Sequence, residues 1–383
     1  MVESVKLNNF LSFGSNSQEI ELRPLNIIVG TNGCGKSNFL EAFDLLRNAP
    51  GDIKKPIRNG GGVLEWLYKG CELNEMPTAS MEFFFNNFQY HLSFTSMNAK
   101  FEIVHEWLKD SSNPVDVKTD GLYYETSNGV SIFTDKSNAT PLRREALSNI
   151  SMISQAGYTM IPITITLFAE IIGKIKLYRD WSFGRDVPCR QHQPVDMPCE
   201  FLESDCSNLA LVLNQMNHDI PAKRRLLKEL QNFYPDVEDY FVNAIGNYVQ
   251  IYFQERGFDK PIPASRLSDG TLRYLCLLAI LCNPNPPPLI CIEEPELGLH
   301  PDVIPCLARL MEEASEKCQL IVTTHSDILV DSFNENPEVI LVAEKVDGET
   351  QMSRLKKDEL APWLEKYRLG ALWTRGDIGG TRW

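Results

Sequence analysis

The feature that most constrains this chain is the run GTNGCGKS at residues 30–37. It has the G-x-x-x-x-G-K-[ST] pattern of a phosphate-binding loop, or P-loop. An apolar, strand-like run precedes it at 25–29 and an amphipathic run follows it at 39–46, which is the strand–loop–helix context that such a loop needs. We therefore predict a nucleotide site here. A chance glycine-rich turn before a helix is the alternative that these flanks disfavour.

The residue types in the loop indicate how a nucleotide would be held. The glycines allow backbone N–H groups to surround a phosphate, and a helix that begins near Lys36 directs the positive end of its dipole at the anion. Lys36 can reach the β- and γ-phosphates, and the hydroxyl of Ser37 can bind Mg²⁺. The predicted nucleotide-binding residues are Gly30, Asn32, Gly33, Cys34, Gly35, Lys36, Ser37 and Asn38.

An acidic pair stands at the end of a second strand-like run. Residues 289–292 are apolar, as in buried parallel strands, and Glu293 and Glu294 come directly after them. Neighbouring side chains on an extended chain point in opposite directions, so the two carboxylates should have different roles. We predict that Glu293 binds Mg²⁺ and that Glu294 is the general base for the attacking water. Two solvated acids at the start of a helix are the alternative.

Two further motifs flank this acidic pair. Upstream, the run LSDG at 267–270 stands before an apolar, helix-like run at 272–281. Ser268 and Gly270 at a helix N-terminus predict a second anion site, which a nucleotide on the P-loop could not share. Downstream, His325 follows an apolar strand-like run and could sense a γ-phosphate. A lone histidine is more often structural, but the order of the motifs favours a functional one.

The order of these motifs resembles that of the ABC-type ATPase heads of the RecF, SMC and OLD (overcoming lysogenization defect) group. The nearest resemblance is to the stand-alone bacterial predicted ATPases of this group, which are OLD-like heads without a Toprim domain. The opening run at 5–13, the combined Walker B and D-loop at 293–301, and the endings at 369–373 and 379–383 look like theirs.

The resemblance implies an α/β fold, namely an ABC-type (RecF/SMC-like) P-loop ATPase head with a mixed core sheet, an antiparallel β-subdomain and a helical insertion. It also implies an enzyme that hydrolyses ATP with Mg²⁺, using Glu294 and His325. Glutamate at 293 departs from the usual aspartate, and the glutamine-loop residue is not obvious. Gln155 is the first candidate for this additional metal ligand and Gln89 the second. The signature residues that would act in trans, on the nucleotide of an opposite head, are Leu267, Ser268, Asp269 and Gly270.

We expect four segments along the chain. They are a P-loop lobe with an antiparallel β meander at 1–140, a helical insertion on the signature side at 141–235, a lobe with the signature, Walker B, D-loop and histidine at 236–345, and a C-terminal tail at 346–383. Turn signals predict the meander at 79–134 and another hairpin at 239–255. Hydrophobic patterns predict helices over Arg143–Ile153, Ile163–Leu177, Asn208–Met216 and Ala222–Phe233.

Composition sets limits on partners and location. The formal net charge of −14 disfavours a broadly basic DNA-binding surface. Local basic clusters at 223–228 and 174–190 would form a stripe only if the fold brought them together, and we interpret them as solvated helix faces or subunit contacts. The ten cysteines lack any C-x-x-C spacing and indicate reduced core residues. We see no signal-peptide pattern and no apolar run near the ~20 residues of a membrane span, so we expect a cytoplasmic protein without membrane contact.

Three function classes remain. The favoured one is an ATP-driven switch that forms a homodimer, or a higher even-numbered oligomer, and gates a separate nuclease-like effector in bacterial anti-phage defence. The second is a RecF-like repair clamp with DNA as its partner. The third, an ABC transporter cassette, is disfavoured by the long interval before the signature. An effector would dock on the 141–234 insertion or on the aromatic tail at 363–383, unless that tail covers the protein's own core.

Overall fold

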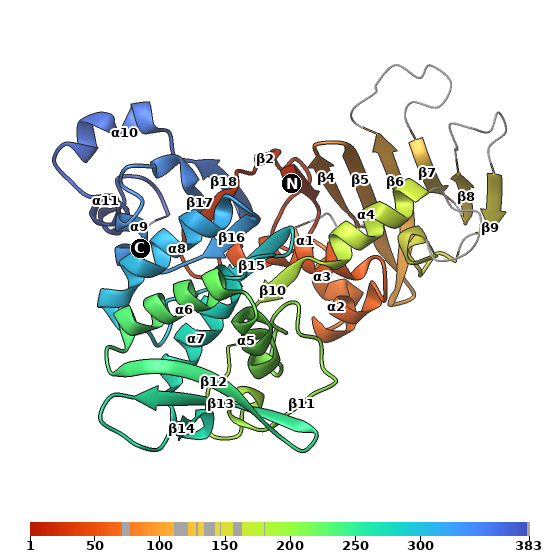
Figure 1. Cartoon of the computed structure of the whole chain (residues 1–383). Coiled ribbons are helices and arrows are strands. Elements are labelled where there is room, and N and C mark those ends of the chain that lie inside the picture. The colour runs from red at the N-terminus through yellow and green to blue at the C-terminus, as the bar shows by residue number, and fades with distance from the viewer. Residues whose placement is uncertain are drawn as a thin grey trace. The chain divides into compact units, whose positions relative to one another are not determined.

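The computed structural model describes residues 1–70, 77–110, 122–127, 129–133, 142–145, 147–155, 163–179 and 181–380. The predicted boundary at 140/141, residues 381–383 of the predicted ending and the side chain of Gln155 lie outside these residues. The chain divides into two compact units, and Figure 1 labels their helices and strands. Unit 1 comprises Met1–Ile175, Asn336–Tyr367 and Ala371–Trp383, and unit 2 comprises Lys176–Glu335 and Arg368–Gly370.

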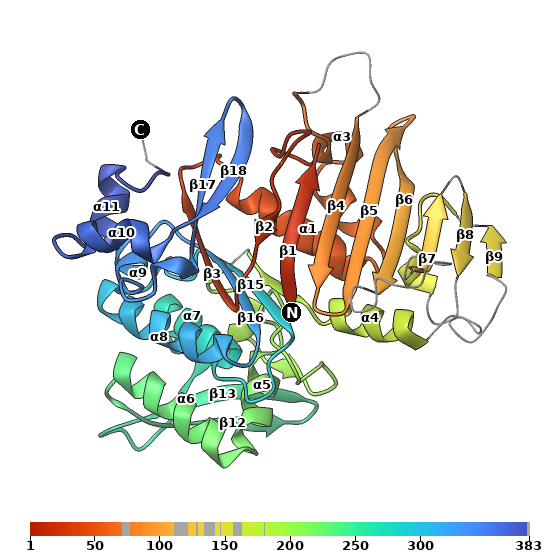
Figure 2. The ribbon, with the colours of Figure 1, turned by 90° about the horizontal axis from the view of Figure 1, so that it is seen from above.

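The largest sheet of unit 1 is antiparallel and has eight strands in the order β2-β1-β4-β5-β6-β7-β8-β9 (Figure 2). Every second side chain of β4 is buried, as expected for a strand with one face on the core. Successive strands from β4 to β8 pair with each other, which confirms the predicted meander. The strands are β1 (Val2–Asn8), β2 (Ile20–Glu21), β4 (Thr78–Phe85), β5 (Phe88–Met97), β6 (Lys100–Asp110), β7 (Leu122–Ser127), β8 (Val130–Phe133) and β9 (Leu142–Glu145).

The helix predicted over Arg143–Ile153 is wrong. Arg143 lies instead on the edge strand β9, where it pairs with Ile132 of β8. The buried carboxylate of Glu106 then accepts hydrogen bonds from Ser151 Oγ at 2.5 Å and from Met152 N at 2.8 Å. These tertiary hydrogen bonds, rather than local helix propensity, fix the segment, which ends in a 3₁₀ turn over Met152–Gln155.

Two helices cover one face of this sheet. Helix α1 (Lys36–Asn48) places the ring of Phe43 5.5 Å from that of Phe83, and helix α4 (Ile163–Gly173) places Phe168 5.2 Å from Phe85. Since Phe83 and Phe85 are alternate residues of β4, both contacts lie on the same face. The packing of α1 anchors the loop that precedes it. Two short helices follow α1 along the chain, α2 (Lys54–Asn59) and α3 (Val63–Trp66).

Unit 1 also holds a three-stranded group that carries the P-loop. Strand β3 (Leu25–Gly30) is buried along its whole length and runs parallel to β17 (Ile340–Val346). Strand β17 forms an antiparallel hairpin with β18 (Glu349–Arg354). Because α1 begins at Lys36, the predicted order of strand, loop and helix is confirmed.

The C-terminal segment contributes to the core. Leu372 and Trp373 are buried in unit 1, and Trp373 Nε1 donates a hydrogen bond to the carbonyl of Gly380 at 3.1 Å. Gly380 N in turn donates to Glu344 Oε1 at 2.9 Å. Leu369, Leu372 and Trp373 of the predicted docking tail are therefore buried, whereas Trp363 and Tyr367 are exposed. The helices here are α10 (Lys357–Leu364) and α11 (Leu369–Arg375).

Unit 2 contains a parallel group of strands in the order β10-β15-β16 and a small antiparallel sheet. The α5 and α6 helices and the β12–β13 hairpin confirm the predictions for these segments, whereas the helix predicted to reach Leu177 ends at Gly173 and Leu177 lies in β10. The strands are β10 (Lys176–Tyr178), β11 (Gln193–Pro194), β12 (Val237–Ile245), β13 (Tyr248–Glu255), β14 (Ile262–Pro263), β15 (Leu289–Glu293) and β16 (Gln319–Thr323). The helices are α5 (Leu209–Asn217), α6 (Ile220–Phe233), α7 (Asp269–Leu281), α8 (Ile304–Ser315) and α9 (Asp327–Asp331).

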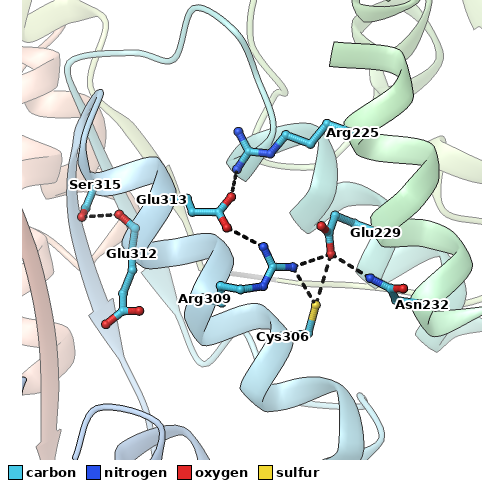
Figure 3. A network of polar contacts seen from close by, with 8 residues as sticks. All are labelled: Arg225, Glu229, Asn232, Cys306, Arg309, Glu312, Glu313 and Ser315. Atoms are coloured by element: carbon cyan, nitrogen blue, oxygen red, sulfur yellow. Dashed lines mark hydrogen bonds and ion pairs between the residues drawn. The ribbon is translucent and has the colours of Figure 1, made fainter. Parts of the chain in front are cut away.

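A polar network joins α6 to α8 (Figure 3). Arg309 of α8 lies 2.5 Å from Glu313 of the same helix and 2.6 Å from Glu229 of α6, which is almost fully buried. Arg225 of α6 pairs with Glu313 at 2.6 Å, and Lys223 pairs with Asp239 at 3.1 Å. These two cations of the predicted basic cluster at 223–228 therefore have acidic partners within unit 2.

Two further expectations concern cysteines and membranes. The described cysteines are free, and all but Cys199 and Cys306 are buried, in agreement with reduced core residues. Within the described ranges, no helix combines the length and the apolar character that crossing a membrane requires.

Candidate nucleotide site

The P-loop connects β3 to α1 in unit 1. Lys36 is buried, and its ammonium group donates hydrogen bonds to the backbone carbonyls of Gly30 and Thr31, both at 2.9 Å. Residues 32 and 33 and the side chain of Ser37 are exposed. The loop therefore presents to solvent the residues that the motif predicts for phosphate and Mg²⁺, while the lysine is held by the loop's own carbonyl groups.

Two residues outside the motif support the loop. Thr350 Oγ1, on β18, lies 2.8 Å from the carbonyl oxygen of Cys34 and 2.6 Å from Ser12 Oγ. Asn38 Nδ2 donates to Ser12 Oγ at 2.8 Å, so this predicted nucleotide-binding residue contacts the same hydroxyl. We call Ser12, Asn38 and Thr350 the P-loop buttress. Sequence reasoning missed Ser12 and Thr350, because no local pattern relates them to Cys34.

The buttress explains why residue 35 is glycine. Gly35 has φ +104°, and a Cβ atom there would clash with the side chains of Thr350 and Ser12. We expect Gly35→Ala to lower the free energy of unfolding by about 1–3 kcal/mol, measured by urea denaturation, because both strain and a clash are introduced. Gly33→Ala is the matched control, since φ is +76° there but no atom lies within 4 Å of the added Cβ. Equal losses in the two variants would mean that backbone strain alone excludes a side chain at residue 35.

The acidic pair closes β15 in unit 2. Glu293 Oε2 lies 3.1 Å from Arg179 Nε, just after β10, and Glu294 Oε1 lies 3.4 Å from His325 Nε2, just after β16. The two carboxylates thus have different partners, in line with the different roles predicted for them. Glu294 has a left-handed backbone with φ 45°. The two side chains therefore do not diverge through the simple alternation of an extended strand.

A third carboxylate fixes the chain at His325. Glu296 Oε1 accepts hydrogen bonds from Thr324 Oγ1 at 2.6 Å and from the backbone N–H of His325 at 3.0 Å. Burial raises the pKa of Glu296 above its ordinary value, although these hydrogen bonds act in the opposite direction. Its Oε2 atom is buried and has no hydrogen-bond partner among the described residues. Glu296, which the sequence placed only in the D-loop, therefore orients the backbone next to the histidine.

The predicted signature forms one wall of a cleft of about 830 Å³ in unit 2. Ser268 caps α7, accepting a hydrogen bond from Thr271 N at 3.0 Å. The buried Arg190 holds the loop through the carbonyl of Leu267 at 2.5 Å and an ion pair with Asp269. Gly270 packs close to the backbone of the D-loop, since a Cβ there would lie 3.2 Å from the carbonyl of Gly298. The lining residues are Gly184, Arg185, Arg190, Ser265, Arg266, Leu267, Ser268 and Asp269.

The predicted residues thus form distinct local groups. The P-loop residues lie together in unit 1, whereas Glu293, Glu294 and His325 lie together in unit 2. Gln89 donates to Glu82 at 2.5 Å on the eight-stranded sheet, and the roles proposed for Gln89 and Gln155 stay predictions. The basic stretch at 174–190, expected to be a solvated helix face or a subunit contact, is neither at Arg179 and Arg190, which point inward and hold the acidic strand and the signature loop.

Two family models match the chain. Residues 1–179 match the family model of the AAA ATPase domain, and residues 177–331 match that of the AAA domain described as a putative AbiEii toxin of a type IV TA system. The chain is a P-loop ATPase. A curated relative of this ATPase is the ATP/GTP phosphatase of Helicobacter pylori, which is 21% identical over 380 residues, covering 94% of this chain and 93% of the relative.

Solved structures give the same fold. An SMC head bound to the C-winged helix domain of ScpA matches the ATPase with a TM-score of 0.56 at 16% identity, over 94% of this chain and 99% of that chain. The SMC head domain with an extended coiled coil, bound to the C-terminal domain of ScpA and derived from Pyrococcus furiosus, matches with a TM-score of 0.53 at 14% identity, over 95% and 98% of the two chains. The predicted fold class, an ABC-type P-loop ATPase head, is confirmed.

Proposed function

We propose that this ATPase is a nucleotide-driven switch whose heads pair around ATP and gate a separate effector protein. The observation that carries the proposal is the signature cleft of unit 2. Its eight lining residues come from the two segments 184–190 and 265–269, and it is bordered by the exposed arginines Arg185 and Arg266. Neither arginine has an ion-pair partner within the part of the chain that the structure describes.

A cleft of this kind suits the phosphates of a nucleotide. The N-terminus of α7 contributes the positive end of a helix dipole, and the two arginines add full charges beside it. An ATP molecule whose phosphates are bound by the P-loop cannot also place those phosphates in the signature cleft. A second copy of the chain, with its own P-loop and ATP, is therefore the source of the phosphate in our proposal.

The chemistry follows from the acidic strand. We assign Glu294 as the general base that takes a proton from water while the water oxygen attacks the γ-phosphorus and the bond to the β-phosphate oxygen breaks, releasing ADP and phosphate. His325, 3.4 Å from Glu294, can orient the carboxylate and donate a hydrogen bond to the γ-phosphate. Lys36 would neutralise charge on the β- and γ-phosphates.

We assign Ser37 and Glu293 to Mg²⁺ from the chemistry of their donor atoms. The exposed hydroxyl of Ser37 and the partly exposed carboxylate of Glu293 are hard oxygen ligands of the kind that Mg²⁺ prefers. Bound together with ATP, the ion would lower the charge that the γ-phosphate develops in the transition state. The ion pair between Arg179 and Glu293 orients this carboxylate.

We further propose that the effector acts in defence against phage. The match of residues 177–331 to an AAA domain family described as a putative AbiEii toxin of a type IV TA system supports a toxin–antitoxin setting for this ATPase. A cytoplasmic site of action follows from this role. The exposed Trp363 in α10 and Tyr367 in the following loop are aromatic residues of the described tail that are available to such a partner.

A RecF-like clamp on DNA is the alternative function. The ion pairs of Lys223, Arg225, Arg179 and Arg190 argue against it, because these cations are already neutralised by carboxylates. Tight DNA binding by the isolated ATPase, with an affinity that falls steeply as salt rises, would favour the clamp over the switch.

Head pairing can be tested with one substitution in the cleft. Ser268→Asp keeps an N-cap acceptor for Thr271 but adds a negative charge where a phosphate is expected. In a Glu294→Gln background, we expect ATP to raise the molar mass about twofold in light scattering, and Ser268→Asp to prevent this rise while ATP still binds. Ser268→Thr, which keeps the cap without the charge, should pair normally. An ATP-dependent rise that Ser268→Asp leaves unchanged would refute the role of the cleft.

A further inference from the structure

Two side chains hold the backbone between the predicted metal ligand and the predicted general base. The indole Nε1 of Trp181 donates a hydrogen bond to the carbonyl oxygen of Glu293 at 3.2 Å. A terminal nitrogen of Arg273 donates to the carbonyl oxygen of Glu294 at 3.0 Å. Consecutive carbonyl groups are therefore each fixed by a side chain from another segment of unit 2, and both glutamates lose freedom to rotate about their backbone bonds.

These two side chains also support each other. The guanidinium group of Arg273 lies over the ring of Trp181 at 5.3 Å and over that of Phe183 at 5.7 Å. The rings of Trp181 and Phe183 are stacked, with centroids 6.0 Å apart and planes 15° apart. Such cation–π contacts become stronger when the cation is removed from water, and Arg273 is 7% exposed. We call Trp181, Phe183 and Arg273 the glutamate clamp.

Burying the guanidinium group of Arg273 costs free energy, and a role in packing alone does not account for a buried charge. Burial lowers the pKa of its guanidinium group, and its Nε atom is buried without a hydrogen-bond partner among the described residues. Glu294, which the clamp restrains, has the strained left-handed value φ 45°. Strained residues of this kind persist where their surroundings fix them, and they concentrate at functional sites.

One residue of the glutamate clamp lies on the helix that follows the signature. Arg273 belongs to α7, whose N-cap is Ser268, and the helix is buried from Thr271 to Leu281. A packed helix moves as a rigid body, so a displacement of Ser268 by a phosphate would also move the guanidinium that holds Glu294. On the basis of the proposed function, we propose that Trp181 and Arg273 are positioning residues. They orient Glu294 toward the attacking water, and they couple the position of Glu294 to occupation of the signature cleft.

The test removes one hydrogen bond and keeps the ring. Trp181→Phe loses the N–H donor to Glu293 but retains an aromatic side chain for stacking on Phe183 and Arg273. We expect kcat for ATP to fall about 10- to 100-fold with KM unchanged, because a small misplacement of the base slows the reaction without weakening binding. The matched control is Tyr178→Phe, which removes a hydrogen bond of 2.8 Å to the carbonyl of Leu202 from a neighbouring buried ring. This control should keep kcat close to that of the wild type.

Variants of Arg273 test whether it positions Glu294 and whether it couples Glu294 to the signature cleft. Arg273→Leu should lower kcat at least as much as Trp181→Phe, while ATP binding and ATP-dependent pairing persist in light scattering. Arg273→Lys, which keeps the charge and one donor, should recover part of the lost kcat. Loss of pairing together with hydrolysis in both Arg273 variants would overturn the coupling, because α7 itself would then be disturbed.

Glu294→Gln in the same assays separates the two proposals. Normal hydrolysis by Glu294→Gln would remove the general base, and with it the proposed chemistry. An inactive Glu294→Gln beside a Trp181→Phe variant with wild-type kcat would refute the clamp and leave the base in place.

Discussion

Glu294→Gln is expected to reduce the rate of ATP hydrolysis by ~10² to 10⁴, since the loss of a positioned general base typically has this effect. The substitution is nearly isosteric, and the amide oxygen can still face His325 at the position of Glu294 Oε1. ATP affinity should therefore be retained. The measurement is steady-state phosphate release together with binding of a fluorescent ATP analogue.

The matched control for this experiment is Glu296→Gln. Glu296 is a neighbouring carboxylate that contacts Thr324 and the backbone of His325 but is not assigned to the water. Its amide oxygen, at the position of Glu296 Oε1, can keep both of these hydrogen bonds, so we expect a loss of rate well below that of Glu294→Gln. Normal turnover by Glu294→Gln, or an equal loss in the two variants, would contradict the assignment of Glu294.

Lys36→Ala is expected to weaken ATP binding by about 10- to 150-fold, because it removes a charge-assisted contact of roughly 1.5–3 kcal/mol to the phosphates. The ammonium group also satisfies the carbonyls of Gly30 and Thr31, so the loop itself loses two hydrogen bonds. Calorimetric titration with ATP measures the affinity, and thermal unfolding without nucleotide measures the effect on the loop.

Lys36→Arg serves as the comparison that keeps the charge. Lys36 is 7% exposed and enclosed by its own loop, so the larger guanidinium should fit poorly and restore little of the affinity. Unchanged ATP binding by Lys36→Ala would exclude the P-loop lysine from the nucleotide site, whatever happens to the stability of the protein.

Local sequence patterns were sufficient for the parts of the site that are contiguous in the chain. The P-loop, the acidic end of β15 and the capped start of α7 are each set by a few neighbouring residues, and the structure has them at the predicted places. The meander followed from its turn residues for the same reason.

The parts that escaped prediction depend on contacts between distant segments. Nothing near Arg190 indicates that it binds the carbonyl of Leu267, and Trp181 lies more than a hundred residues before Glu293, whose carbonyl it holds. The predicted helix at Arg143–Ile153 failed because the buried Glu106 and the edge of β8 fix that segment. Such long-range hydrogen bonds override local propensity, and a single sequence does not reveal them.

The P-loop buttress has a consequence for the folding of the chain during its synthesis. Cys34 and Thr350 are 316 residues apart, and β3 needs β17 as its parallel neighbour. A ribosome releases the P-loop long before it releases this hairpin, so the nascent chain carries the motif without the partners that hold it in shape. We therefore expect ATP to stabilise the chain more once β17 and β18 have been synthesised. A product that ends before this hairpin keeps the P-loop motif but lacks Thr350 and β17.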